Sequence, residues 1–131
     1  MRIVFDSLPK ARAALVQALH TRGVKAYSGA DTYSVFGHTD YGAFILSFLP
    51  GNRRTLVSNG VEIKVSLRNQ GYGTKMCRLR EDAAKDAGVT LLLATVMDSN
   101  LPEIRVLTKC GWSRLTQNLE TACSLWGKTL S

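Results

Sequence analysis

The strongest constraint on the fold comes from residues 61–97, which read strand, glycine loop, helix and strand in that order. From Val61 to Leu67 apolar and polar side chains alternate, as they do in a strand with one buried face. The helical run that follows has four apolar residues on one face, Met76, Leu79, Ala83 and Ala87, and ends at Gly88. Residues 89–97 (VTLLLATVM) are almost continuously apolar, which is typical of a central strand covered on both faces. This order predicts one parallel crossover.

The N-terminal half adds a helix and antiparallel strands. Residues 2–5 (RIVF) read as a short strand, and Ser7 and Pro9 stand where a helix begins that Gly23 ends. From Thr32 onward the pattern changes to a hairpin and a third strand, which contains a bulge or a turn at SNG.

The C-terminal half repeats the alternation of helix and strand. Asn100, with Glu103 three residues later, is typical of a capped helix start, and Gly111 stops that helix. Residues 112–116 and 121–126 are the last two strand candidates. We therefore expect an α+β fold, a mixed and mostly antiparallel twisted sheet flanked by about three helices, in a single domain spanning residues 1–131.

Composition narrows the class of protein. The chain carries 17 basic and 10 acidic side chains, and its formal net charge of +7 would attract RNA, a phosphorylated cofactor or an acidic protein. The three cysteines, Cys77, Cys110 and Cys123, form no CxxC pair, so neither a disulfide framework nor a metal site is expected.

Because we find no signal-peptide core and no run long enough to cross a bilayer, we expect a cytoplasmic protein that does not bind membranes.

Two glycines, Gly71 and Gly73, lie in the loop RNQGYGT at the start of the central helix. Glycine allows positive φ and lets a ligand approach the backbone without a Cβ in the way. The unpaired amides and the dipole of a helix N-terminus can hold a pyrophosphate, to which Arg68 and Lys75 would add positive charge. The loop lacks the third glycine of the dinucleotide fingerprint and the GK[ST] ending of a P-loop, so neither NAD nor ATP is indicated. A tight turn without a ligand is the alternative interpretation.

A resemblance to a known family adds to this reading. The loop RNQGYG resembles the R/Q-x-x-G-x-G/A loop of the GNAT superfamily of N-acetyltransferases, and Asn100 followed by Gly111-Trp112 is similar to that family's second motif, N-x(10)-G-F. The resemblance is strong over residues 61–112 and looser elsewhere, because residues 24–31 leave little room for the family's second helix. The chain is thus identified as a short member of that superfamily with a GNAT-like sheet, which implies an acetyl-CoA-dependent N-acetyltransferase.

The resemblance implies where acetyl-CoA binds. The cofactor would lie where the strand ending at Leu67 separates from the strand ending at Met97. Backbone groups around Ile63 and Val65 would pair with the pantetheine, and Asn100 would contact the cofactor arm. The pyrophosphate would be held by Arg68, Asn69, Gln70, Gly71, Tyr72, Gly73 and Thr74. No metal takes part.

The implied reaction transfers the acetyl group directly from the thioester to an amine, which must lose a proton before it attacks. Many family members carry a tyrosine seven residues after the motif asparagine, as proton donor to the thiolate, and a carboxylate about five residues before it. This sequence has Leu107 and Thr95 at these places. Glu62, on the strand beside the cofactor, is the first substitute base, against the reading of an exposed carboxylate paired with a lysine. Asp98 is the second, unless it only begins the turn.

Other reactive or aromatic side chains are read as structural: Cys110 and Tyr72 as packing, Trp112 and Trp126 as core or interface, His20 at a helix end, His38 in a hairpin turn.

Two alternatives from other classes stay open: an acyl-CoA-binding module without transfer chemistry, and a basic nucleic-acid-binding domain. The acceptor amine belongs to a protein, an aminoacyl-RNA or a small molecule, with an acidic protein or an RNA-linked amine suited to the positive charge. A homodimer through Leu125-Trp126 is a further expectation.

Overall fold

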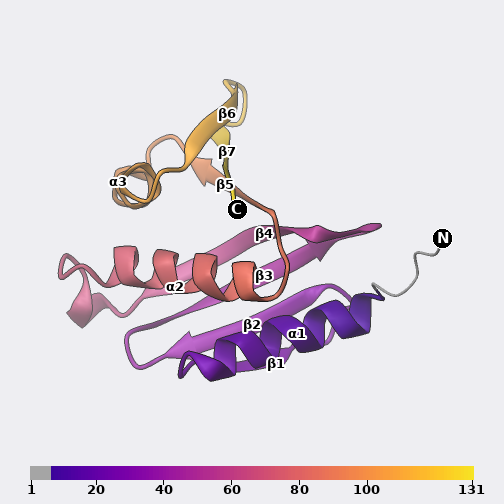
Figure 1. Cartoon of the computed structure of the whole chain (residues 1–131). Helices are drawn as coiled ribbons and strands as arrows, with labels where there is room; N and C mark the ends of the chain where they lie inside the picture. The colour runs from indigo at the N-terminus through magenta and orange to yellow at the C-terminus, as the bar shows by residue number, and fades with distance from the viewer. Residues whose placement is uncertain (1–6) are drawn as a thin grey trace.

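The computed structural model describes residues 7–131, in which three α-helices and one short 3-10 helix accompany seven strands (Figure 1). The helices are α1 (Leu8–Thr21), α2 (Tyr72–Asp86) and α3 (Leu101–Lys109), and the 3-10 helix η1 (Val65–Leu67) precedes α2. The strands are β1 (Lys25–Ser28), β2 (Ser34–Thr39), β3 (Gly42–Leu49), β4 (Asn52–Ile63), β5 (Leu91–Met97), β6 (Ser113–Asn118) and β7 (Cys123–Thr129). The strand expected at residues 2–5 lies outside the described residues.

The seven strands form one sheet in the order β1-β2-β3-β4-β5-β7-β6. Every neighbouring pair is antiparallel except β4 and β5, which the crossover through α2 makes parallel. The expected α+β fold with one parallel crossover is confirmed. The parallel contact is short: Thr55, Leu56 and Val57 pair with Leu91, Leu92 and Leu93, and the pairing ends there. The two strands therefore separate after Val57 and Leu93, which opens the sheet beside the start of α2.

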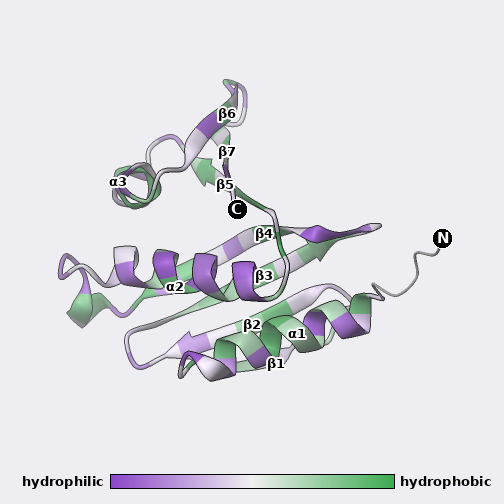
Figure 2. Cartoon of the chain, in the orientation of Figure 1, coloured by the Kyte–Doolittle hydropathy of each residue, from purple (hydrophilic) through white to green (hydrophobic). Residues whose placement is uncertain are grey.

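Helices α1 and α2 lie side by side over β1–β4 (Figure 1). Helix α1 begins as predicted, because the Ser7 side chain caps it by accepting a hydrogen bond from the Lys10 amide at 3.3 Å. Apolar and polar residues mix along both helices (Figure 2), and the fully buried ones, such as Leu15 and Met76, pack into the core. No helix within residues 7–131 has the length and apolar character needed to cross a membrane.

Two details of the predicted strands are wrong. The alternation from Val61 to Leu67 suggested a single strand, but β4 ends at Ile63 and the chain turns into η1, where Val65 is 76% exposed. Strand β5 is not covered on both faces, since Thr95 and Met97 are exposed on the face opposite its buried residues. The periodicity of seven residues could not reveal the turn, because a 3-10 helix of three residues is too short to show its own period of three.

The bulge expected in SNG is present in β4. Phe44 of β3 pairs with Val61 and Ile45 pairs with Asn59, so Gly60 is the extra residue. A bulge of this kind bends the strand and increases its local twist. It lies a few residues beyond the last parallel pair and contributes to the separation of β4 from β5.

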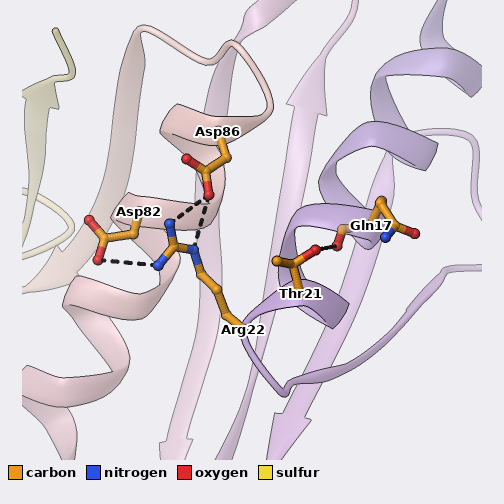
Figure 3. Close-up of polar contacts among 5 residues, drawn as sticks. All are labelled: Gln17, Thr21, Arg22, Asp82 and Asp86. Atoms are coloured by element: carbon orange, nitrogen blue, oxygen red, sulfur yellow. Dashed lines mark hydrogen bonds and ion pairs between the residues drawn. The ribbon is translucent and has the colours of Figure 1, made fainter.

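An ion-pair cluster joins the end of α1 to the end of α2 (Figure 3). Arg22 donates from Nε and Nη2 to the Asp86 carboxylate, at 3.1 and 2.6 Å, and its Nη1 lies 3.8 Å from Asp82. Thr21, one residue earlier, donates its hydroxyl proton to the Gln17 carbonyl at 2.9 Å. Since these groups are partly exposed, the cluster orients the helices more than it stabilises them.

A buried polar network fixes α2 against β7 and the end of α3. The Glu81 carboxylate accepts hydrogen bonds from Lys128 Nζ at 2.6 Å and from Trp112 Nε1 at 2.8 Å. The Cys77 thiol donates to the same carboxylate at 3.3 Å, and burial raises the pKa of that thiol. Cys77, Glu81 and Cys110 bring their potential ligand atoms within 4.8 Å of one another, but the ammonium and indole groups already occupy the carboxylate oxygens.

Candidate functional site

The loop between β4 and α2 presents a row of unbonded backbone amides. Asn69 and Gly71 take the left-handed conformation, with φ of 62° and 86°, and the first helical hydrogen bond runs from the Lys75 amide to the Gly71 carbonyl at 3.1 Å. No group within residues 7–131 accepts a hydrogen bond from the amides of residues 69–74. These donors and the positive end of the α2 dipole form an arrangement suited to an anion.

Two side chains of the loop stabilise its conformation by hydrogen bonds to the preceding segment. Arg68 donates from Nε to the Ile63 carbonyl at 3.1 Å, and Gln70 donates from Nε2 to the Ser66 carbonyl at 3.2 Å. Both bonds use carbonyls of the preceding segment. The loop therefore keeps its shape without using its own amides.

A cavity of about 610 Å³ lies beside this loop, where β4 has left β5. It is lined by Val61, Glu62, Ile63, Leu67, Arg68, Asn69, Gly71, Gly73, Thr74, Asn100, Pro102, Glu103, Arg105 and Val106. Most of the residues singled out from the sequence are thus brought to one cavity. The wall contributed by α3 was missed, because no sequence motif marks which face of a short helix turns toward a cleft.

The two loop glycines differ in what they allow. A Cβ on Gly71 would meet nothing within 4 Å, so only its left-handed backbone resists a side chain. A Cβ on Gly73 would come within 3.1 Å of Val106 on α3. Gly73 therefore permits the close approach of α2 and α3 that forms this end of the cavity.

Three of the predicted binding residues do not line the cavity. Val65 lies in η1, and the side chain of Gln70 bonds back to the chain. Tyr72 stacks on Tyr41 with ring centroids 4.7 Å apart, in agreement with its reading as a packing residue. The Lys75 ammonium lies 5.3 and 5.9 Å from these two rings.

Lys75 therefore belongs to a second cavity, of about 430 Å³, that lies against the α1–β1 connection, α2 and the β2–β3 turn. The expectation that Lys75 adds charge at the pyrophosphate is not supported by this position. Arg68 and Arg105 are the cations of the larger cavity, with Glu62 and Glu103 as its acids.

Asn100 has a structural role that its spacing predicted. Its side chain caps α3 by accepting a hydrogen bond from the Glu103 amide at 3.3 Å. The cap places Asn100 at the mouth of the cavity, opposite the glycine loop. One residue thus fixes the start of α3 and contributes to the cavity wall.

The two candidate bases differ in their surroundings. Glu62 is exposed and lines the cavity, and its carboxylate makes no hydrogen bond or ion pair with another described residue. Asp98 accepts hydrogen bonds from Ser124 Oγ at 2.5 Å and Gln117 Nε2 at 3.0 Å, and does not line the cavity. These bonds, with that from Ser124 the stronger influence, hold the pKa of Asp98 below its ordinary value. Asp98 is therefore a weak base that ties the end of β5 to β6 and β7.

The positions that carry the usual acid and base of the resembling family are also resolved. Leu107 is 2% exposed and packs in the core, and Thr95 is exposed on β5. Cys110 is buried, as its reading as packing predicted. His20 bonds the Ala26 carbonyl at 2.8 Å. His38 lies within β2, not in the hairpin turn.

Both tryptophans belong to the core of the chain, Trp112 at 5% and Trp126 at 6% exposure. Trp126 therefore offers little surface to a second copy, whereas Leu125 is half-buried, and the homodimer through Leu125-Trp126 stays a prediction. Arg114 covers its ring at 5.4 Å from the centroid.

The fold and the cavity together define an α+β domain in which one short parallel strand pair opens beside a glycine loop at a helix N-terminus. The chain belongs to the acetyltransferase (GNAT) family, whose model matches residues 37–112, more than half of its length. The match runs from β2 to Trp112 and includes the loop, the α2 crossover and α3. The expected family is confirmed. No curated protein has a matching sequence.

Solved structures of low sequence identity share the fold. The IAA acetyltransferase from Bacillus cereus is 15% identical, with a TM-score of 0.63 over 75% of this chain and 79% of the other. The Salmonella typhimurium protein yncA, with its cofactor acetyl-CoA, is 16% identical, with a TM-score of 0.63 over 92% and 72%. The spermidine N-acetyltransferase from Vibrio cholerae, in complex with CoA and spermine, is 10% identical, with a TM-score of 0.68 over 77% and 68%.

Proposed function

We propose that residues 1–131 form one N-acetyltransferase domain that transfers the acetyl group of acetyl-CoA to an amine in the cytoplasm. The observation that carries this proposal is the row of unbonded amides at residues 69–74, which borders the cavity between β4 and α3. Membership of the GNAT family supports acetyl transfer. The structures from Salmonella typhimurium and Vibrio cholerae hold acetyl-CoA and CoA, which supports the same ligand here.

The residues of the cavity suit the parts of acetyl-CoA. The amides of residues 69–74 would donate to the pyrophosphate, with Arg68 and the α2 dipole compensating its charge. The backbone of Ile63, the last residue of β4, would pair with the pantetheine as a neighbouring strand does. Asn100 would contact the arm from the start of α3.

Bound acetyl-CoA supplies a thioester, an acetyl group activated for transfer. The amine nitrogen forms a bond to the carbonyl carbon while the carbon–sulfur bond breaks. Glu62 takes the proton that the amine loses, because it is the carboxylate that β4 contributes to the cavity wall, two residues from the bulged Gly60. The departing thiolate is protonated by water, since Leu107 offers no proton.

Replacing Glu62 by glutamine is expected to lower kcat about a hundredfold, the lower range for loss of a general base, with the KM for acetyl-CoA nearly unchanged. Steady-state release of CoA measures both constants. Asp40→Asn, which removes an exposed carboxylate outside this cavity, is the matched control and should keep kcat within about twofold of the wild type. Equal rates for Glu62→Gln and the control would assign the proton transfer to another group.

The second candidate is an acyl-CoA-binding module without transfer chemistry. It is favoured by Leu107, which stands where many family members carry the proton-donating tyrosine and which is buried in the core. It shares the cavity and the ligand with the first candidate. The two differ only in whether CoA is released.

Saturating acetyl-CoA is expected to stabilise the protein by about 2.7 kcal/mol at one hundred times its Kd, seen as a rise in Tm. A nucleic-acid-binding domain would give no such rise. Hydroxylamine is a small amine that needs no dedicated acceptor site, but it also cleaves thioesters unaided. Release of CoA thiol with hydroxylamine above the rate measured without the protein therefore separates the enzyme from the binding module. Mass spectrometry after incubation with labelled acetyl-CoA and a lysate containing protein and RNA then identifies the acceptor class.

A further inference from the structure

Arg80, in the middle of α2, is a buried cation that has no carboxylate partner among the described residues. It is 3% exposed and makes no ion pair with any residue from 7 to 131. Its Nε donates to the Met76 carbonyl at 3.3 Å, its Nη1 donates to the Ser58 hydroxyl, and its guanidinium carbon lies 6.0 Å from the centroid of the Phe44 ring. Removing a cation from water is costly, and no carboxylate oxygen of the described residues lies within 4.0 Å of this one.

The contacts of Arg80 lie at the point where the sheet opens. Ser58 directly follows Val57, the last residue of β4 that pairs with β5. Phe44 pairs with Val61 on the far side of the bulged Gly60. Arg80 therefore contacts β4 just before the bulge, at Ser58, and lies near Phe44, whose strand partner Val61 directly follows the bulge.

The same point lies on β4 just before the residues that line the cavity, Val61, Glu62 and Ile63. With the pyrophosphate at residues 69–74, the pantetheine would run back along β4 from Ile63 toward Ser58. Five residues of strand cover roughly 17 Å, which is the scale of an extended pantetheine arm. The thioester would then lie near the bulge that Arg80 supports.

We propose that Arg80 is a positioning residue for acetyl transfer, an inference that rests on the proposed function. It acts through Ser58 by holding the bent segment of β4 where the thioester must lie. It also places a fixed positive charge beside the bulge, near the proposed position of the thioester, whose oxygen gains negative charge as the amine attacks. A fixed charge in a buried site acts without the reorganisation that water would need.

A purely structural role makes a different prediction. If Arg80 were only a structural contact, removing it would lower mainly the stability of the protein. Replacing a buried charge by an apolar side chain of similar volume is, however, often neutral or stabilising. The informative variant is therefore Arg80→Met combined with Ser58→Ala, which removes the charge and its hydroxyl partner together. Arg80→Lys keeps the charge and loses the planar donor fork. Arg78→Met, on the exposed side of the same helix, is the matched control.

The test measures kcat and the KM for acetyl-CoA with hydroxylamine as acceptor, together with the Tm of each variant. We expect the double variant to keep a wild-type Tm and KM and to lose kcat about tenfold or more, as for a misplaced reacting group. Arg80→Lys should recover part of kcat, and Arg78→Met should match the wild type.

A folded double variant with wild-type kcat overturns the inference. If the double variant does not fold, wild-type kcat and Tm in Ser58→Ala overturn it instead, because Arg80 is proposed to act through the Ser58 hydroxyl. A wild-type protein that binds no acetyl-CoA overturns the proposed function itself.

Discussion

Gly71→Glu is expected to weaken the binding of acetyl-CoA about a thousandfold, which corresponds to ~4 kcal/mol of binding free energy. The new carboxylate would stand at the N-cap of α2, among the amides proposed to hold the pyrophosphate, and would repel it. A side chain at φ of 86° adds backbone strain of about 1 kcal/mol. Isothermal titration calorimetry with acetyl-CoA measures the change in Kd.

Gly88→Glu is the matched control for this experiment. Gly88 has φ of 85°, and a Cβ there also meets nothing within 4 Å, so the strain and the added charge are the same. Gly88 lies beyond the other end of α2, away from the cavity. We expect its variant to lose stability and to keep the wild-type Kd. An unchanged Kd in Gly71→Glu would show that the pyrophosphate does not bind at the glycine loop.

Lys128→Met is expected to lower the free energy of unfolding by about 3 kcal/mol, the cost of leaving a buried charge without its partner. Lys128 Nζ lies 2.6 Å from Glu81 Oε1 and also donates to the Cys110 carbonyl at 2.6 Å. The two side chains are only 28% and 10% exposed, so water cannot replace the ammonium fully. Urea unfolding at neutral pH measures the loss.

Combining Lys128→Met with Glu81→Gln should restore most of that stability, since the neutral amide oxygen can still accept the hydrogen bond from Trp112. Lys109→Met, which removes an exposed lysine at the end of α3, should change the free energy of unfolding by less than about 0.5 kcal/mol. If Lys128→Met were as stable as Lys109→Met, the buried network would contribute nothing to the docking of α2 on β7.

The elements that the sequence predicted well are those fixed by local signals. Ser7 with Pro9 begins α1, Asn100 begins α3, and Gly88 and Gly111 end α2 and α3 with φ of 85° and 86°. Each of these signals acts within one turn of helix. The glycine loop was recognised for the same reason, because its conformation depends on the residues it contains.

The elements that it predicted poorly depend on partners far along the chain. The end of β4 at Ile63 is decided by where its neighbouring strands stop pairing, which the alternation to Leu67 could not register. Lys75 was assigned to the pyrophosphate by its position in the sequence, but Tyr41, 34 residues earlier, draws it to the other side of α2. No local pattern marks Arg80 and Glu81 as buried, and only packing against β4 and β7 buries them.

The sequence by itself therefore determined the order of the elements, the crossover, the loop and the family, because hydrophobic periodicity and glycine conformation are properties of neighbouring residues. The tertiary structure decided which charged side chains line the cavity and which are held in hydrogen bonds outside it. It separated Glu62, free in the cavity wall, from Asp98, which is held by Ser124 and Gln117. That distinction is set by contacts between residues distant in the chain, and local sequence patterns do not contain it.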